Sequence, residues 1–226
     1  MMKFLTRYAN DERADSPANK FRRERFKLFR SLLETVPKPY KILDVGGKEA
    51  FWEQMNFTNE PDVEIVLLNL ATMPVSLPKF TSCAGDARNM QQFQEKEFDV
   101  VFSNSVIEHV GDFEQQERMA SEVRRVGKRY FVQTPNRYFP LEPHFLFPYF
   151  QILPFEAQVF LVRHFDVGWY KKLSDRWRAE ELINSHRLLT KNEMLQLFPQ
   201  SNLFHEKFFG FTKSFIAYGG WDDHRV

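Results

Sequence analysis

The sequence predicts an α/β fold, a doubly wound and mostly parallel sheet with helices on both faces. Two observations predict it: short apolar runs alternate with helical stretches from residue 40 onward, and the first run stops at Gly46 and Gly47. Hydrophobic residues make up 43% of the 226 residues, so the chain can bury a sizeable core and is not disordered.

The predicted elements follow one another in a regular order. Strands are expected at 40–45, 64–70, 81–84, 98–103 and 129–134. Helices are expected at 17–36, 49–56, 87–93 and 112–126. Thr190 and Glu193 form a capping-box pattern that opens a further helix, and the runs 203–209 and 211–218 predict an antiparallel pair at the sheet edge.

We expect a single domain, 1–226, with four parts. They are an N-terminal basic helix region (1–39), a core (40–136), an insertion (137–189) and a C-terminal helix with a strand pair (190–226). The insertion contains eleven aromatic residues within 138–170, together with four prolines and several charges. These breaks disfavour a membrane-spanning helix, and they leave a lid over a site or an interfacial membrane contact as interpretations.

The charge balance and the cysteine content indicate which partners and which cellular location to expect. The 31 Lys and Arg residues balance the 30 Asp and Glu residues, so no nucleic-acid partner is expected. A local excess of basic residues lies in 16–41, which predicts a solvated helix surface or a patch for an anionic membrane. With one cysteine, Cys83, and an N-terminus that turns polar early, we expect no signal peptide and a cytoplasmic, possibly membrane-peripheral, location.

The glycine pair at the end of the first strand is the strongest local signal. Gly46 and Gly47 let the backbone pass close to a ligand and then turn into a helix. Lys48 and Phe51 stand where a dinucleotide fingerprint would need its other glycines. The pattern therefore disfavours a nicotinamide oxidoreductase.

Polar residues follow at the ends of successive strands. Asn69 ends the second strand, Asp86 with Ala87 follows the third, and Ser103 with Asn104 ends the fourth. Each alone also suits a helix cap or a turn. In this order they predict the rim of one adenosyl pocket.

These motifs resemble the class I S-adenosylmethionine-dependent methyltransferases, specifically the small-molecule type 11 group. The resemblance covers about 40–136 and rests on Leu43–Gly47, Gly85–Ala87, Phe98–Val101 and Ile107–Val110. It implies a Rossmann-like seven-stranded, mostly parallel sheet with a helical aromatic insertion after strand five. It also implies S-adenosyl-L-methionine as the cofactor.

The resemblance implies a role for each matching residue. The methionine moiety is expected at Asp44, Gly46 and Gly47, the ribose at Asn69, the adenine at Asp86 and Ala87, and the sulfonium end at Ser103 and Asn104. Lys48 and Ala50 replace glycines common in the family loop, and Asn69 replaces an acid. An amide accepts from a hydroxyl without charge assistance.

Function is expected to be methyl transfer to a small acceptor, with a sugar or another hydroxyl as the first choice. Such an acceptor needs a base, and His109 and His144 are the candidates, although either could instead cap a backbone carbonyl. No metal-ligand set is identified. The alternative is a catalytically silent adenosyl-binding protein that uses its aromatic surface at a membrane or a partner.

Overall fold

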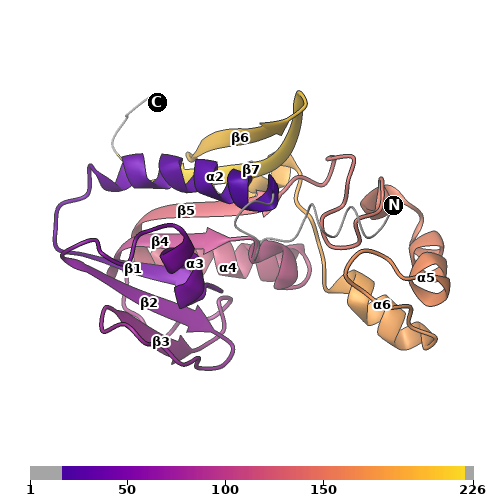
Figure 1. Cartoon of the computed structure of the whole chain (residues 1–226), viewed down its shortest axis with the longest axis horizontal. Helices are drawn as coiled ribbons and strands as arrows, with labels where there is room; N and C mark the ends of the chain where they lie inside the picture. The colour runs from indigo at the N-terminus through magenta and orange to yellow at the C-terminus, as the bar shows by residue number, and fades with distance from the viewer. Residues whose placement is uncertain (1–16, 222–226) are drawn as a thin grey trace.

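Figure 1 shows the computed structural model, which describes residues 17–221. One seven-stranded sheet has the strand order β3-β2-β1-β4-β5-β7-β6. Within it, β7 runs antiparallel to both of its neighbours, and the other pairs are parallel. The strands are β1 (Tyr40–Val45), β2 (Val63–Asn69), β3 (Phe80–Ala84), β4 (Phe98–Asn104), β5 (Gly127–Pro135), β6 (Asn202–Phe208) and β7 (Phe211–Gly219). The mostly parallel α/β prediction is confirmed.

Helices cover the sheet and extend beyond it (Figure 1). They are α2 (Pro17–Leu33), α3 (Glu49–Gln54), α4 (Phe113–Val126), α5 (Phe155–His164), α6 (Arg176–Asn184) and α7 (Lys191–Leu197), with short 3₁₀ turns η1 (Ile107–His109) and η2 (Phe150–Ile152). The capping box that opens α7 is present, with Glu193 N donating to Thr190 Oγ1 and Thr190 N donating to Glu193 Oε2. The first sixteen residues of the predicted N-terminal region lie outside the described range.

The helix predicted at 87–93 is wrong. The segment forms turns, with an isolated bridge between Asp86 and Asn89. Asp86 accepts from the backbone N–H of Arg88, and this local bond offers the backbone an alternative to a helix.

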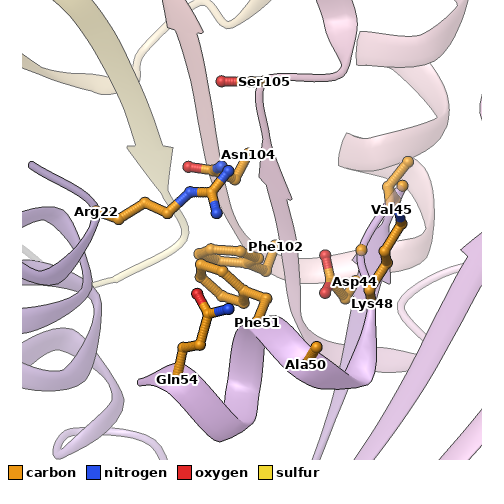
Figure 2. A pocket seen from close by; sticks show the side chains of 12 residues that line it. Arg22, Asp44, Val45, Lys48, Ala50, Phe51, Gln54, Phe102, Asn104 and Ser105 are labelled. Atoms are coloured by element: carbon orange, nitrogen blue, oxygen red, sulfur yellow. The ribbon is translucent and has the colours of Figure 1, made fainter. Parts of the chain in front are cut away.

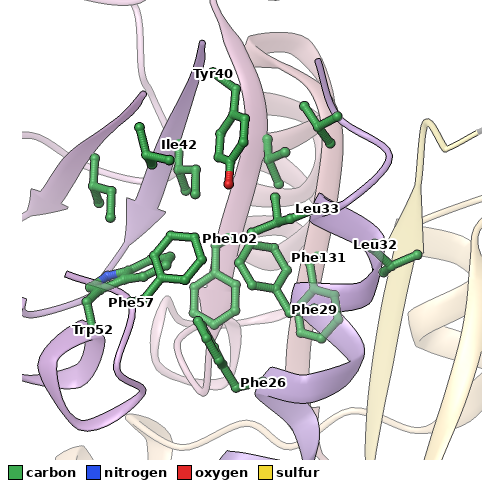
Figure 3. Close-up of a cluster of buried hydrophobic side chains, with 14 of the residues drawn as sticks. Phe26, Phe29, Leu32, Leu33, Tyr40, Ile42, Trp52, Phe57, Phe102 and Phe131 are labelled. Atoms are coloured by element: carbon green, nitrogen blue, oxygen red, sulfur yellow. The ribbon is translucent and has the colours of Figure 1, made fainter. Parts of the chain in front are cut away.

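Strand side chains alternate between two buried cores. On one face, Ile42 and Phe102 pack under α2 and α3, where Phe29 and Trp52 are fully buried. Figure 3 shows these rings from three elements gathered into one cluster. Phe29 lies 4.7 Å from Phe102 and 5.1 Å from Phe131, measured between ring centroids. These phenylalanine contacts therefore pack α2 against the sheet.

The opposite face is covered by α4 and α7. Leu43 and Val101 point to this side, where Met119, Val123 and Met194 are fully buried. The two faces alternate residue by residue because successive side chains of a strand point in opposite directions. The register aligns Val45 with Leu68 and Ser103, so the carboxyl ends of β1, β2 and β4 meet at one edge.

The insertion lies beyond this carboxyl edge (Figure 1). Its helices α5 and α6 share a hydrophobic cluster that includes Phe145, Phe150, Val162 and Ile183. Other large side chains of the insertion stay exposed, among them Phe160, Phe165, Trp169 and Trp177. Within 17–221, no helix combines the length and the apolar character needed to cross a membrane.

Candidate active site

Three cavities meet at the carboxyl edge of the sheet. The glycine-loop cavity, about 410 Å³, is lined by the end of β1, the start of α3 and the end of β4. The strand-edge cavity, about 290 Å³, lies over the ends of β2 and β3 and shares Val45 and Gly46 with the first. The aromatic cavity, about 230 Å³, lies between α2, the insertion and the C-terminal strands, and shares Ser105 with the first.

The glycine loop needs glycine at both positions. Gly46 has a φ of +77°, and a Cβ there would lie 2.5 Å from Cγ2 of Val106. A Cβ on Gly47 would lie 1.6 Å from Oδ2 of Asp44, which no side chain can accommodate. The loop therefore presents bare backbone to the cavity, and it holds the Asp44 carboxyl against the second glycine.

Asp44 is a buried acid with one unsatisfied oxygen. Its Oδ2 accepts a 2.8 Å hydrogen bond from Nε1 of Trp52, while Oδ1 has no partner among the described residues. Burial raises the pKa of Asp44 to about 7, against the smaller opposing effect of the Trp52 bond. A cationic ligand group in this cavity would satisfy Oδ1 and favour the carboxylate.

Aromatic rings form one wall of the glycine-loop cavity. Phe51 and Phe102 stack with a centroid distance of 5.4 Å, and Figure 2 shows them beside Asp44. The side chain of Arg22 extends from α2 toward Asn104 at the end of β4 (Figure 2). Asn104 Oδ1 also accepts from Arg25, so α2 is tied directly to the end of β4.

The strand-edge cavity collects the predicted residues of β2 and β3. Asn69 lines it and donates through Nδ2 to the Gly47 carbonyl at 2.9 Å, which joins it to the glycine loop. Asp86 and Ala87 also line it. The carboxyl of Asp86 accepts from Nε and Nη2 of Arg88, and these hydrogen bonds lower the pKa of Asp86.

The structure adds Arg88, which was not predicted from the sequence, and Ser103, which was predicted, lines none of the three cavities. Arg88 lines the strand-edge cavity and forms an ion pair with Asp86, the predicted adenine contact. Its position two residues after Asp86 matches no motif, so the sequence did not indicate this role. Ser103 is fully buried and its Oγ has no partner in the described range, so its place beside the ligand stays a prediction. Side chains alternate along β4, so Asn104 lines the cavity together with Ser105, in the loop just past the strand.

The aromatic cavity has apolar walls and an ionic end. Its walls include Phe21, Phe139 and Phe208. At the ionic end, Arg25 and Lys213 both bond the buried Glu206. Burial opposes the charge on Glu206, but the two cations outweigh it and lower the pKa of Glu206 to about 2.

The two predicted histidines are neighbours. Their ring centroids lie 4.8 Å apart, and a third ring, His186, lies 4.9 Å from His109 and 4.4 Å from His144. We call His109, His144 and His186 the histidine cluster. Sequence reasoning missed His186, because it lies at the far end of the insertion and carries no spacing signal.

Different surroundings shift the pKa values of His144 and His109 in opposite directions. Burial disfavours the charged form of His144, whose Nδ1 lies 2.7 Å from Oε1 of the buried Glu142. The hydrogen bond to Glu142 and the charges of Glu142 and Glu108 together outweigh burial and raise the pKa of His144. Burial, followed by the neighbouring rings, lowers the pKa of His109 to about 4. His109 lines the strand-edge cavity, and Pro143, next to His144, lines the aromatic cavity.

Comparisons with known proteins agree with this geometry. Residues 56–130 match the family model described as "Methyltransferase domain". Uncharacterised proteins from two strains of Mycobacterium tuberculosis are 45% identical over 56 residues, which span 25% of this chain and 19% of their own length.

Solved structures share the fold at low sequence identity. A SAM-dependent methyltransferase from Methanosarcina mazei has a TM-score of 0.54 at 12% identity, covering 83% of this chain and 95% of that one. One from Aquifex aeolicus has a TM-score of 0.51 at 8% identity, covering 90% and 93%. These likenesses concern the fold.

The residues present fit an S-adenosylmethionine ligand. The partnerless oxygen of Asp44 suits its cationic methionine end, and the glycine loop leaves space that a Cβ would fill. The strand-edge cavity adjoins this loop and offers an amide and a carboxyl for the polar groups of an adenosine. Residues 56–130 are therefore similar to a methyltransferase domain, and the chain shares its fold with solved SAM-dependent methyltransferases.

Proposed function

We propose that the protein transfers the methyl group of S-adenosylmethionine to a small acceptor held in the aromatic cavity. One observation carries this proposal: the glycine-loop cavity shares Gly46 with the strand-edge cavity and Ser105 with the aromatic cavity. A cofactor spanning the first two cavities would have its sulfur close to their junction. The acceptor cavity adjoins the glycine-loop cavity at Ser105.

The chain's own residues have distinct tasks in this proposal. Asp44 and the Gly46–Gly47 backbone bind the methionine part, and Asn69 accepts from the ribose hydroxyls. Asp86 and the Ala87 amide contact the adenine. Asn104 and Ser105 lie beside the sulfonium end, where Ser105 is held by a 2.9 Å bond from its Oγ to Gln133. A bound sulfonium is a good leaving group, so the protein mainly aligns the acceptor and excludes water.

The acceptor is proposed to carry a hydroxyl, such as that of a sugar or a glycan. The rings of Phe21, Phe139 and Phe208 offer flat apolar surfaces for a ring-shaped acceptor. Arg25 and Lys213 line the ionic end of the cavity and carry N–H groups that can donate to the polar groups of the acceptor. The cavity volume of about 230 Å³ suits a small molecule or one terminal residue of a larger one.

Removal of the acceptor proton is assigned to His144, with His109 as its neighbour. Glu142 accepts from Nδ1 of His144 and so orients the ring, which leaves Nε2 as the base. His109 lines the strand-edge cavity, and Pro143, the chain neighbour of His144, lines the aromatic cavity.

Calorimetry with S-adenosylmethionine followed by transfer of a labelled methyl group tests the proposal. We expect saturable binding and label transferred into a small-molecule fraction of a cell extract. Binding without transfer to any fraction would favour a catalytically silent adenosyl-binding protein. No binding at high cofactor concentration would remove the enzyme proposal.

A second proposal concerns location at an anionic membrane. Phe160, Phe165 and Trp177 are exposed on the insertion, and Arg23 and Lys27 are exposed on α2. Flotation with anionic liposomes should carry the protein upward, and a Phe160→Ser, Trp177→Ser variant should stay below. If the wild-type protein does not float, the membrane proposal fails and the methyl-transfer proposal is unaffected.

A further inference from the structure

The histidine cluster brings three ring nitrogens to one point from separate parts of the chain. His109 lies at the end of η1, His144 precedes the first helix of the insertion, and His186 follows α6. One nitrogen from each ring lies within 4.8 Å of those of the other two. Imidazole nitrogen is a preferred ligand of zinc and neighbouring transition metals, and it is a poor one for magnesium or calcium.

Each ring is already held in the tautomer that a metal ligand needs. Nδ1 of His144 contacts the Glu142 carboxylate at 2.7 Å, and Nδ1 of His186 contacts the Leu182 carbonyl at 2.9 Å. His109 bonds the Ser185 carbonyl. Because a carboxylate or carbonyl oxygen can only accept, each of these nitrogens carries the proton, and the other nitrogen carries the lone pair. Ligating histidines typically have this outer bond.

The surroundings favour a cation at the cluster. Glu142 is buried at 2% exposure, and its oxygens accept from His144 and from the backbone N–H of Phe145. Glu108, next to His109 in the chain, is fully buried, and its Oε1 has no partner among the described residues. A bound cation would be attracted by these two buried carboxyl groups, which lie close to the ring nitrogens in the chain or in space.

From these contacts we propose that His109, His144 and His186 form a binding site for one divalent transition-metal ion of the zinc class. Three histidines with an open fourth position form a common protein zinc site. Zinc–nitrogen bonds of about 2.0–2.1 Å place tetrahedral ligand nitrogens about 3.3 Å apart, so the nitrogens must close by up to about 1.5 Å. His144 and His186 lie in irregular segments of the insertion, which can make this shift.

One existing contact must be given up. The Tyr170 hydroxyl lies 2.9 Å from Nε2 of His186, the nitrogen that would bind the ion. An ion bound here also takes the ring lone pairs that proton removal requires. The histidine cluster can therefore serve either as a metal site or as the base for proton removal, but not as both at once. The metal site goes beyond the proposed function.

The test is titration of the chelator-treated full chain with Zn²⁺ by calorimetry and with Co²⁺ by visible absorption. We expect one equivalent of Zn²⁺ and the d–d bands of tetrahedral Co²⁺. His109→Ala and His186→Ala each remove a ligand and should weaken binding by more than about 100-fold, beyond the 10- to 100-fold typical of outer-ligand changes. His164→Ala is the matched control, because His164 lies on the same insertion and bonds Phe160 instead.

Two variants keep the result independent of folding. Although the neighbouring rings crowd its imidazole, His109 as a whole residue is exposed to solvent. Its replacement should therefore leave the far-ultraviolet circular dichroism unchanged even if His186→Ala does not fold. Wild-type binding that equals that of the His109→Ala variant, or no binding by the wild type, would overturn the site. Neither result affects calorimetry with S-adenosylmethionine, so failure of the metal site and failure of the proposed function are distinguishable.

Discussion

Trp52 donates a 2.8 Å hydrogen bond from Nε1 to Oδ2 of Asp44, and this bond links α3, the helix after the glycine loop, to the end of strand β1. Both side chains are buried, at 0% and 1% exposure. The bond fixes the carboxyl so that Oδ1 is the oxygen left without a partner. Asp44, which lines the glycine-loop cavity, therefore keeps one buried and oriented acceptor without a partner among the described residues.

Asp44→Asn should weaken S-adenosylmethionine binding. A hydrogen bond to a charged group contributes about 1.5–3 kcal/mol, so we expect a dissociation constant roughly 10- to 100-fold higher by calorimetry. Glu53→Gln is the control, because Glu53 is exposed on α3, the helix that carries Trp52, and its replacement should leave the affinity unchanged. An Asp44→Asn affinity within twofold of wild type would contradict this role.

Cofactor affinity should depend on pH through Asp44. Its pKa is raised to about 7, so the carboxyl is mostly neutral below pH 6 and becomes anionic as the pH rises through 7. Binding of a cation should therefore strengthen between pH 5.5 and 7.5, measured by calorimetry. The Asp44→Asn protein should show a flatter profile, and equal slopes for the two proteins would argue against this assignment.

Gly46→Ala should cost more stability than Gly210→Ala. Both glycines have positive φ, of +77° and +83°, so both variants meet a left-handed backbone penalty of about 1–2 kcal/mol. At Gly46 the new Cβ also collides with Val106, whereas at Gly210 it meets nothing within 4 Å. Overpacking adds about 1–3 kcal/mol, which urea unfolding can resolve.

The comparison also separates folding from binding. Gly210→Ala should bind S-adenosylmethionine normally, and Gly46→Ala should bind it poorly even at temperatures where it is folded. Equal stability losses for the two variants would show that Val106 yields without cost.

Glu206 should make folding sensitive to acid. Its pKa is lowered from 4.5 to about 2 in the folded protein, so its ion pairs contribute fully above pH 4.5 and are lost as the pH falls toward 2. The shift corresponds to at most about 3 kcal/mol. Urea midpoints measured down this range should fall more steeply for the wild type than for Glu206→Gln. Parallel curves would mean that Glu206 is not the titrating group.

Much of the fold was predictable because it follows local patterns. The apolar run at 40–45 and the capping box at Thr190 report backbone preferences that neighbouring residues decide, and both elements are confirmed. The helix at 87–93 failed because a side chain, Asp86, bonded the backbone of Arg88 instead. Ser103 is fully buried in β4, so its predicted role stays a prediction.

The sequence by itself determined the mostly parallel sheet, the glycine loop and the order of polar residues at strand ends, since these depend on spacing along the chain. Only the tertiary structure decided that Arg25 reaches Glu206 across 181 residues and that His186 joins His109 and His144. Such contacts depend on how distant segments pack, and packing leaves no periodic trace in either segment. For that reason motifs predicted which residues line the glycine-loop and strand-edge cavities, whereas the histidine cluster and the aromatic cavity could not be predicted from them.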